Sequence, residues 1–311
     1  MPVFSVVIPL YNKEKYIAQT LENVLKQRFT DFEIIVVNDG STDASGKIVK
    51  SFSDARISYF STANHGAAAA RNFGIEKSTA PYIAFLDADD LWMQNHLEEL
   101  KKLIDRFPQA GMYCNRYQLI FENGSTYQPS FYGIDDTYEG VVEDYFAASL
   151  HYAVASSISV AVPKSIFSEI GNFKKYISSG QDTDMWIRIA LHSKIIIGNK
   201  LTSSYLHYIE GSLSKTDILQ KNIKRFDEYQ DHEKSNLSLK KYLDLYRMEY
   251  AMQYKMAGAS NESKSLYNQI SKDNLSVKSK ALYILPKGIL LLLLKIKQLL
   301  RRNGIDFSIY N

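Results

Sequence analysis

The sequence predicts an α/β fold, with a mostly parallel central sheet flanked by helices and a helical region at the C-terminal end. Short apolar runs alternate with helical segments over the first ninety residues, and this alternation is typical of βαβ units. Strand signals end at about residue 216, and helix formers dominate after it. The 311 residues suffice for one large α/β domain plus an appendage.

Apolar runs rich in β-branched and aromatic residues mark the first strands, and helical segments separate them. The strands are expected at residues 4–9, 33–38, 57–61 and 82–86, and the helices at residues 14–27, 44–52 and 67–77. Ligands of such sheets bind beyond the carboxyl ends of the strands. Two polar segments fall there, Asn38-Asp39-Gly40 and Asp87-Ala88-Asp89.

The pattern after residue 90 is less regular. It predicts helices at 93–107 and 183–192, strands at 112–121, 155–162, 195–200 and 202–208, and a Gly- and Tyr-rich stretch at 123–140. We therefore divide the chain into a domain at residues 1–215, with halves at 1–92 and 93–215, and a helical region at residues 216–311.

Composition and charge limit the location and the partners that we expect for this protein. The single cysteine, Cys114, excludes an intramolecular disulfide and a Cys-rich metal site, and favours a reducing, cytoplasmic location. The N-terminus has no basic and apolar leader, so we expect no secretory signal. The net charge is only +3, and the basic residues of the segment 278–302, which contains no Asp or Glu, contribute more than that. The rest of the chain is mildly acidic, so we expect no nucleic-acid partner.

An acidic cluster follows the fourth predicted strand. Asp87, Asp89 and Asp90 place three carboxylates within four residues, and these repel one another unless a cation compensates them. Mg²⁺ and Mn²⁺ take oxygen ligands and are commonly shared between protein carboxylates and substrate phosphates. Alternation along an extended chain puts Asp87 and Asp89 on one side. Asp90 is expected to point elsewhere or to cap a helix beginning near Trp92.

The segment VVNDGSTD at residues 36–43 is weaker evidence. A strand-to-helix turn with a helix cap explains most of these residues. A functional interpretation adds Asp39 as an acceptor for a base N–H or a ribose hydroxyl.

Taken in order, the motifs resemble the family 2 glycosyltransferases of the GT-A fold, inverting enzymes of bacterial polysaccharide and glycoconjugate synthesis. The resemblance covers about two thirds of the chain and rests on SVVIPLYNKEKYI, NDGSTD, ARNFGI, FLDADD and, at 170–189, IGNFKKYISSGQDTDMWIRI. It implies that residues 1–92 bind the nucleotide and residues 93–215 the acceptor.

The resemblance also assigns roles on the donor side. Pro9, Tyr11 and Asn12 would line the nucleotide pocket, and Asp39 would recognise the base. Arg71 would lie near the donor diphosphate, with a surface salt bridge on its helix as the alternative. Asp87, Ala88 and Asp89 would form the Asp-X-Asp element, in which Asp87 and especially Asp89 contact Mn²⁺ or Mg²⁺.

On the acceptor side, Asp182 matches the family's catalytic base, which deprotonates the acceptor hydroxyl as it attacks the anomeric carbon. Asp184 is the competing candidate, and a helix cap is an alternative role for either. Gln181 stands where relatives usually carry Glu, and Ile209 where a His often stands. His207 is offset by two residues, so a third protein ligand for the metal is in doubt.

The tail at residues 281–302 is apolar but interrupted by lysines. About 7 residues from Gly288 to Leu294 are free of charge, far fewer than the ~20 that a spanning helix needs. A basic helix lying in the membrane interface fits better. Packing on the catalytic domain or at a homodimer seam is the alternative.

These observations predict a metal-dependent, inverting transferase. It would move a sugar from a nucleotide donor, by family expectation a UDP-sugar, to a glycan or lipid-linked acceptor at the cytoplasmic membrane face. One alternative is a nucleotidyltransferase. Such enzymes usually carry a Gly-rich basic loop after the first strand, and the segment PLYNKEKY has no such loop. Another is a non-catalytic subunit of a polysaccharide assembly complex, which Gln181 suggests and which Asp182 and the acidic cluster oppose.

Overall fold

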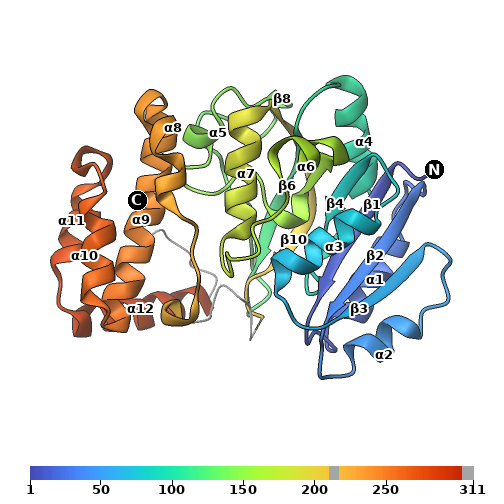
Figure 1. The fold of residues 1–311 in the computed structure, drawn as a ribbon, viewed down its shortest axis with the longest axis horizontal. Coiled ribbons are helices and arrows are strands. Elements are labelled where there is room, and N and C mark those ends of the chain that lie inside the picture. Colours follow the sequence, from blue (N-terminus) through green and yellow to red (C-terminus); the bar gives the residue numbers. More distant parts are fainter. Residues whose placement is uncertain (210–216, 303–311) are drawn as a thin grey trace.

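A computed structural model describes residues 1–209 and 217–302, and these residues are built around one mixed β-sheet (Figure 1). The strands follow the order β3-β2-β1-β4-β9-β6-β10-β5 across this sheet, with two short strands, β7 and β8, attached to β6 and β10. In Figure 1 the parallel part stands on the right and the C-terminal helices stand on the left, beyond α7.

The first part of the chain forms the parallel part of the sheet, as predicted. The strands are β1 (Phe4–Leu10), β2 (Phe32–Asp39), β3 (Ile57–Thr62) and β4 (Tyr82–Phe85), and the helices are α1 (Ile17–Leu25), α2 (Ser45–Lys50) and α3 (Ala67–Lys77). Alternate β1 residues enter two separate cores, Val7 on one face of the sheet and Val6 and Ile8 on the other. A side chain at Gly74 of α3 would collide with Val7, so this glycine lets α3 lie close against β1.

The second part of the sheet is mostly antiparallel. The strands are β5 (Leu91–Trp92), β6 (Met112–Ile120), β7 (Thr126–Tyr127), β8 (Gly140–Val141), β9 (Val160–Pro163) and β10 (Ile195–Leu206), and the helices are α4 (His96–Arg106), α5 (Tyr145–Ala148), α6 (Lys164–Ile170) and α7 (Gln181–His192). Only β6 and β10 run parallel here, whereas β9 is antiparallel to both β4 and β6.

Three details differ from the sequence prediction. The strand expected at 155–162 opens with a 3₁₀ turn, η1 (Ser157–Ser159), before β9 begins. The two strands expected at 195–200 and 202–208 are one strand, β10, whose pairing with β6 is irregular between Ile197 and Ser203. No helix begins near Trp92, because Leu91–Trp92 pairs with β10 as strand β5 and α4 starts at His96.

The C-terminal region is helical, as predicted. Its elements are η3 (Ile218–Gln220), η4 (Phe226–Tyr229), α8 (Gln230–Ser235), α9 (Leu237–Ala257), α10 (Ser260–Asn268), η5 (Lys272–Asn274), α11 (Val277–Ile284) and α12 (Lys287–Arg302). The domain boundary predicted at residues 215 and 216 lies outside the described residues. Tyr242 and Tyr250 of α9 share a core with Met112 and Trp186, so the beginning of this region packs into the sheet domain. Within residues 1–209 and 217–302, no helix is both long and apolar enough to cross a membrane.

Candidate active site

The loops after β1 and β2 are joined by hydrogen bonds at the carboxyl edge of the sheet. The backbone N–H of Asn12 donates to Ser41 Oγ at 3.0 Å, and the N–H of Thr42 donates to Asn12 Oδ1 at 2.8 Å. Asn12 has a φ of 50°, a left-handed conformation that Asn tolerates better than most residues. Pro9 pairs with Val37 inside the sheet, while Tyr11 is 46% exposed at the edge. The three predicted pocket residues Pro9, Tyr11 and Asn12 therefore lie together where β1 ends.

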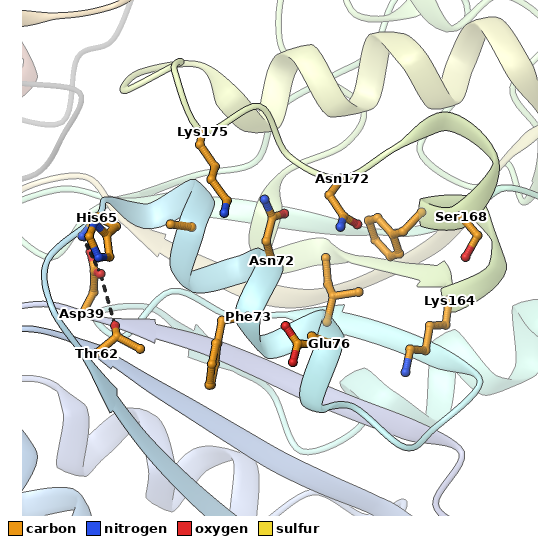
Figure 2. Close-up of a pocket in the computed structure, with 13 residues that line it drawn as sticks. Asp39, Thr62, His65, Asn72, Phe73, Glu76, Lys164, Ser168, Asn172 and Lys175 are labelled. Carbon is orange, nitrogen blue, oxygen red and sulfur yellow. Dashed lines mark hydrogen bonds between the residues drawn. The ribbon is translucent and has the colours of Figure 1, made fainter.

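Asp39 anchors the turn that leads into α3. Its two carboxylate oxygens accept the backbone N–H groups of His65 at 2.9 Å and Gly66 at 2.8 Å. The next residue, Gly40, has a φ of 74°. A Cβ atom at Gly40 would lie 2.8 Å from the backbone nitrogen of Asn64. Asp39 is buried, and it faces one end of a cavity of about 530 Å³ (Figure 2).

That cavity lies beside α3, between it and the residues around α6. Figure 2 shows Asn72 of α3 on the side of Asn172 and Lys175, and Phe73 and Glu76 on the opposite side of the helix. Arg71 of the same helix is not among the residues that line the cavity. Of the predicted site residues only Asp39 lines this cavity, so the cavity is separate from the acidic cluster.

Both carboxylates of the Asp-X-Asp element form ion pairs with cationic side chains from other parts of the chain. Arg71 Nη2 lies 2.6 Å from Asp87 Oδ1, and Lys13 Nζ lies 2.7 Å from Asp89 Oδ2. Arg71 is 4% exposed, so the alternative of a surface salt bridge on its own helix is wrong. Within the described residues its buried Nε and Nη1 atoms have no hydrogen-bond partner.

Hydrogen bonds from other parts of the chain hold the backbone of the Asp-X-Asp element in place. Thr20 of α1 donates its hydroxyl to the carbonyl of Ala88 at 3.0 Å and to that of Asp90 at 3.2 Å. Asp90 is buried and accepts the N–H of Leu206 at 2.8 Å, so it ties the cluster to β10 and does not cap a helix. Burial, together with the charges of Asp89 and Asp87, raises the pKa of Asp90 well above its ordinary range.

The donor set of this cluster suits a hard divalent cation. Asp87 and Asp89 retain side-chain exposures of 29% and 16%, and both offer carboxylate oxygens. Burial raises the pKa of Asp89, and the Lys13 ammonium opposes this shift. In the described part of the chain no group of three or more His, Cys, Asp or Glu residues could hold a metal. Two carboxylates alone would leave the other ligands of a bound Mg²⁺ to a diphosphate and water.

His207 makes aromatic contacts. Its ring lies 5.7 Å from that of Phe121 and 6.1 Å from that of Tyr205. Ile209 is buried, with an exposed fraction of 2%. Both observations suit residues that pack at the end of β10.

Asp182 and Asp184 lie on the first turn of α7 but in different surroundings. The Asp182 carboxylate accepts the N–H of Thr183 at 2.7 Å and the hydroxyl of Ser157 at 3.3 Å. Gly180 precedes the helix in a left-handed conformation, with φ 78° and ψ 23°. This turn places Asp182 after a sharp change of chain direction, where a glycine is favoured.

The Asp184 carboxylate is saturated with donors and has no exposed surface. Oδ1 accepts from Lys174 at 2.9 Å and from the hydroxyl of Tyr229 at 2.5 Å, and Oδ2 accepts from Arg188 at 2.9 Å. Burial would raise the pKa of Asp184, but these hydrogen bonds and charges outweigh it and lower the pKa. Asp184 therefore serves as an anchor between α7 and the segment around Tyr229.

The sequence profile of glycosyl transferase family 2 matches residues 5–170, more than half of the chain. The chain belongs to this family. Residues Pro9 to Asp89 fall inside the match and Asp182 lies beyond it.

Curated relatives of the family are similar over part of their length. An uncharacterized glycosyltransferase of Rickettsia bellii is 35% identical over 60% of this chain and 26% of its own length. The glycosyltransferase GlyA of Streptococcus pneumoniae is 39% identical over 45% of this chain and 20% of its own length. The chain thus spans between about a fifth and two thirds of the length of these curated relatives.

Among solved structures, residues 1–349 of Staphylococcus aureus TarS in complex with UDP-GlcNAc match with a TM-score of 0.60. The match covers 88% of this chain and 89% of that one at 17% identity. This likeness confirms the GT-A fold, including the helices that follow the sheet.

Two residues near the site were not predicted. Lys13 reaches Asp89, and Lys224 lies buried close to Gly180. Lys13 stands inside the recognised segment PLYNKEKY, but a loop has no periodicity that could show which way its lysine points. Lys224 belongs to a segment without any recognised motif.

Proposed function

We propose that this protein is an inverting glycosyltransferase that moves a sugar from a nucleotide-diphosphate donor to a hydroxyl of a glycan or lipid-linked glycan. The observation that supports this best is the charged cluster at the edge of the sheet. There Arg71 pairs with Asp87 while two of its other nitrogens lack a partner in the described structure. A diphosphate with a divalent cation would supply both an anion for Arg71 and a cation for the carboxylates.

On the donor side, Asp39 and the loop of Tyr11 and Asn12 are the groups proposed to hold the nucleoside. UDP is the proposed nucleotide, because the TarS structure of matching fold carries UDP-GlcNAc. Asp87 and Asp89 would hold Mn²⁺ or Mg²⁺, which when bound neutralises charge that develops on the leaving diphosphate. Arg71 would stabilise the charge of the same phosphates through its guanidinium.

On the acceptor side, Asp182 is the proposed base. Its carboxylate has only two donors among the described hydrogen bonds, whereas Asp184 is enclosed by three side chains. The Asp182 carboxylate would take the proton of the acceptor hydroxyl as that oxygen attacks the anomeric carbon opposite the diphosphate. Attack from that face inverts the configuration.

A thermal-shift panel of nucleotide sugars with and without Mn²⁺ tests the donor assignment. We expect UDP-sugars to raise the Tm in Mn²⁺, because a ligand at 100 times its Kd stabilises the folded state by about 2.7 kcal/mol. EDTA and the variant Asp89→Asn should each abolish the shift. If no nucleotide raises the Tm, the alternative of a non-catalytic subunit of an assembly complex replaces this proposal. Inversion is tested separately, by the anomeric NMR signal of the product.

We also propose that helix α12 attaches the enzyme to the anionic cytoplasmic face of the membrane. The helix directs a stripe of apolar side chains into solvent, with exposed fractions of 45% for Ile289, 57% for Leu292 and 61% for Leu299. At about 100° per residue these side chains share one face, while Leu290 faces the protein. Exposed Lys295 flanks the stripe, which suits an interfacial helix on acidic lipid.

Vesicle flotation tests this surface. The full chain should float with vesicles containing phosphatidylglycerol and not with phosphatidylcholine alone. The double variant Leu292→Glu and Leu299→Glu should stay in solution, while Leu237→Glu, at an 81% exposed leucine of α9, should float like wild type. A dimer by light scattering that the double variant dissociates, without lipid binding, would instead show a homodimer seam.

A further inference from the structure

Lys13 pairs with Asp89, one of the two carboxylates that are proposed to hold the metal. Its ammonium lies 2.7 Å from Asp89 Oδ2, and each side chain of this pair is only 16% exposed. An ion pair that is partly withdrawn from water is screened less than a pair on the surface. Mg²⁺ binds a carboxylate oxygen at about 2.0–2.1 Å, so a metal on Oδ2 and this ammonium would compete for one oxygen atom.

The backbone of Lys13 is held at both of its polar groups. Its N–H donates to Ser45 Oγ at 2.8 Å. Its carbonyl accepts the N–H groups of Tyr16 and Ile17 at 3.0 Å each, where α1 begins. The side chain, in contrast, is an ammonium on a flexible carbon stem. The ammonium can therefore move away from Asp89 without a change in the loop or in α1.

Two ion pairs neutralise the Asp-X-Asp element. Lys13 balances Asp89, and Arg71 Nη2, at 2.6 Å from Asp87 Oδ1, balances the other carboxylate. A divalent cation that entered alone would leave two positive charges without compensation, close to both of these fixed cations. Like charges at such short distances repel one another strongly where water is partly excluded. The ion alone should therefore bind weakly.

A sugar nucleotide changes this charge balance. Each phosphate of its diphosphate carries one negative charge, so a divalent cation and the diphosphate form a neutral complex. This complex adds no net charge to the Asp-X-Asp element. Its phosphate oxygens would also give the displaced Lys13 ammonium a new partner, through a charge-assisted hydrogen bond. The two ion pairs therefore favour the complex of metal and diphosphate over either component alone.

We propose that Lys13 couples the binding of the metal to the binding of the sugar nucleotide. It holds the Asp89 carboxylate until the metal complex of the donor takes this carboxylate, and its ammonium then pairs with the diphosphate. The inference rests on the proposed role of Asp87 and Asp89 as metal ligands. It adds that the free ion is a poor ligand of this site and that the donor brings its metal with it.

Binding of free Mn²⁺ tests the inference without turnover. Electron paramagnetic resonance measures the unbound ion in a titration of wild type, Lys13→Met and Lys15→Met. Lys13→Met removes the competing ammonium, so we expect its Kd for Mn²⁺ without nucleotide to be about tenfold lower than that of wild type. Lys15 is an exposed lysine of the same loop. Lys15→Met loses the same charge but leaves Asp89 paired, so its Kd should stay within about twofold of wild type.

The same titration in saturating UDP separates coupling from simple repulsion. With UDP bound, Lys13 has a phosphate partner, so Lys13→Met loses an attraction where it had lost a competitor. The tighter binding of Mn²⁺ in Lys13→Met should therefore disappear or reverse. A tenfold difference that persists in UDP would overturn the proposed coupling, because the ammonium would then only repel the ion.

Two further variants keep the test independent of one substitution. Lys13→Arg keeps the positive charge and should bind free Mn²⁺ as weakly as wild type. Lys13→Gln is neutral and should behave like Lys13→Met, and it replaces that variant if Lys13→Met does not fold. Equal Kd values for Mn²⁺ without nucleotide in wild type and in all Lys13 variants would overturn the inference.

Asp89→Asn separates this inference from the proposed function. Added to Lys13→Met, it should weaken the binding of free Mn²⁺ at least about tenfold, because the carboxylate that Lys13→Met makes available is lost. Unchanged binding in this double variant would mean that the ion does not use Asp89, and the inference would be wrong. Transfer from a UDP-sugar with a Mn²⁺ Kd that is insensitive to Lys13 would remove this inference alone. Competition at Asp89 with no nucleotide sugar accepted would remove the proposed function alone.

Discussion

The donor side and the acceptor side of this molecule are held together in different ways. At the donor side, neighbouring loops after β1 and β2 bind each other through backbone N–H groups, as between Asn12 and Ser41. Its charged residues form single pairs at the sheet edge, as between Arg71 and Asp87. A short stretch of chain therefore builds most of the donor side.

The acceptor side depends on contacts with residues far along the chain. The loop before α7 is bound to the segment 222–229 by Ser178 with Asn222 and by the ion pair of Lys174 with Glu228, and α7 itself is bound to it by Asp184 with Tyr229. The Asp184 carboxylate has no exposed surface there and contacts Lys174, Arg188 and Tyr229. The difference suggests that the donor side is rigid on its own, whereas the base depends on the C-terminal helices for its position.

The largest effect should come from removing the base. Asp182→Asn keeps the size of the side chain but cannot take a proton, so we expect transfer to fall about 10²–10⁴-fold. UDP binding and the Tm should remain near those of wild type, because Asp182 makes only two described hydrogen bonds. Steady-state kinetics and UDP titration measure both. Full activity in this variant would remove Asp182 as the base and with it the contrast between the two sides.

Asp184→Asn should act on stability, although Asp184 lies only two residues from Asp182. Removing one member of a buried, hydrogen-bonded charge cluster costs about 3–5 kcal/mol, because the remaining charges stay buried. Urea unfolding at pH 7 measures the loss of unfolding free energy. The pKa of Asp184 is lowered in the folded protein. The ionised carboxylate therefore stabilises the fold at pH values above the ordinary pKa of an aspartate, and this stabilisation decreases as the pH falls below about 4. The gap between wild type and variant should therefore narrow at acid pH, and a constant gap would argue against an ionised Asp184.

The contrast between the two sides also explains which residues could be placed from the sequence. Asp39, Asp87 and Asp89 follow apolar strands, and alternation along a strand is readable from neighbouring residues. Asp90 was expected at a helix start, but Leu91–Trp92 instead pairs with Ser203 and Ser204, a contact that no local pattern encodes. Lys224 is likewise positioned by α9 and by Ser178, both distant in sequence. The place of a candidate residue in the fold was thus predictable where its partners are local, and was missed where tertiary packing decides it.

Arg71→Lys should weaken the donor side without unfolding it. A lysine keeps the charge but loses the fork of nitrogens that can bind two phosphate oxygens, so we expect UDP affinity in Mn²⁺ to drop about 10–30-fold. Arg56→Lys is the matched control, because Arg56 forms a partly exposed pair with Asp54 away from the acidic cluster. Calorimetric titration gives both affinities. Equal affinities in the two variants would mean that Arg71 only supports Asp87.

The smallest effect tests how the C-terminal helices position the turn before Asp182. Gly180 has a φ of 78°, and a Cβ there would lie 3.0 Å from the hydroxyl of Tyr250. Gly124 has a similar φ of 79° with nothing near its Cβ position. Alanine at either site should cost about 1–2 kcal/mol of backbone strain, and Gly180→Ala should cost about 1 kcal/mol more because Tyr250 must move. Combining Gly180→Ala with Tyr250→Phe should recover that excess in urea unfolding, since it removes the contacting oxygen. Equal costs for the two alanines would show that α9 does not confine the turn, and the acceptor side would then be as self-supporting as the donor side.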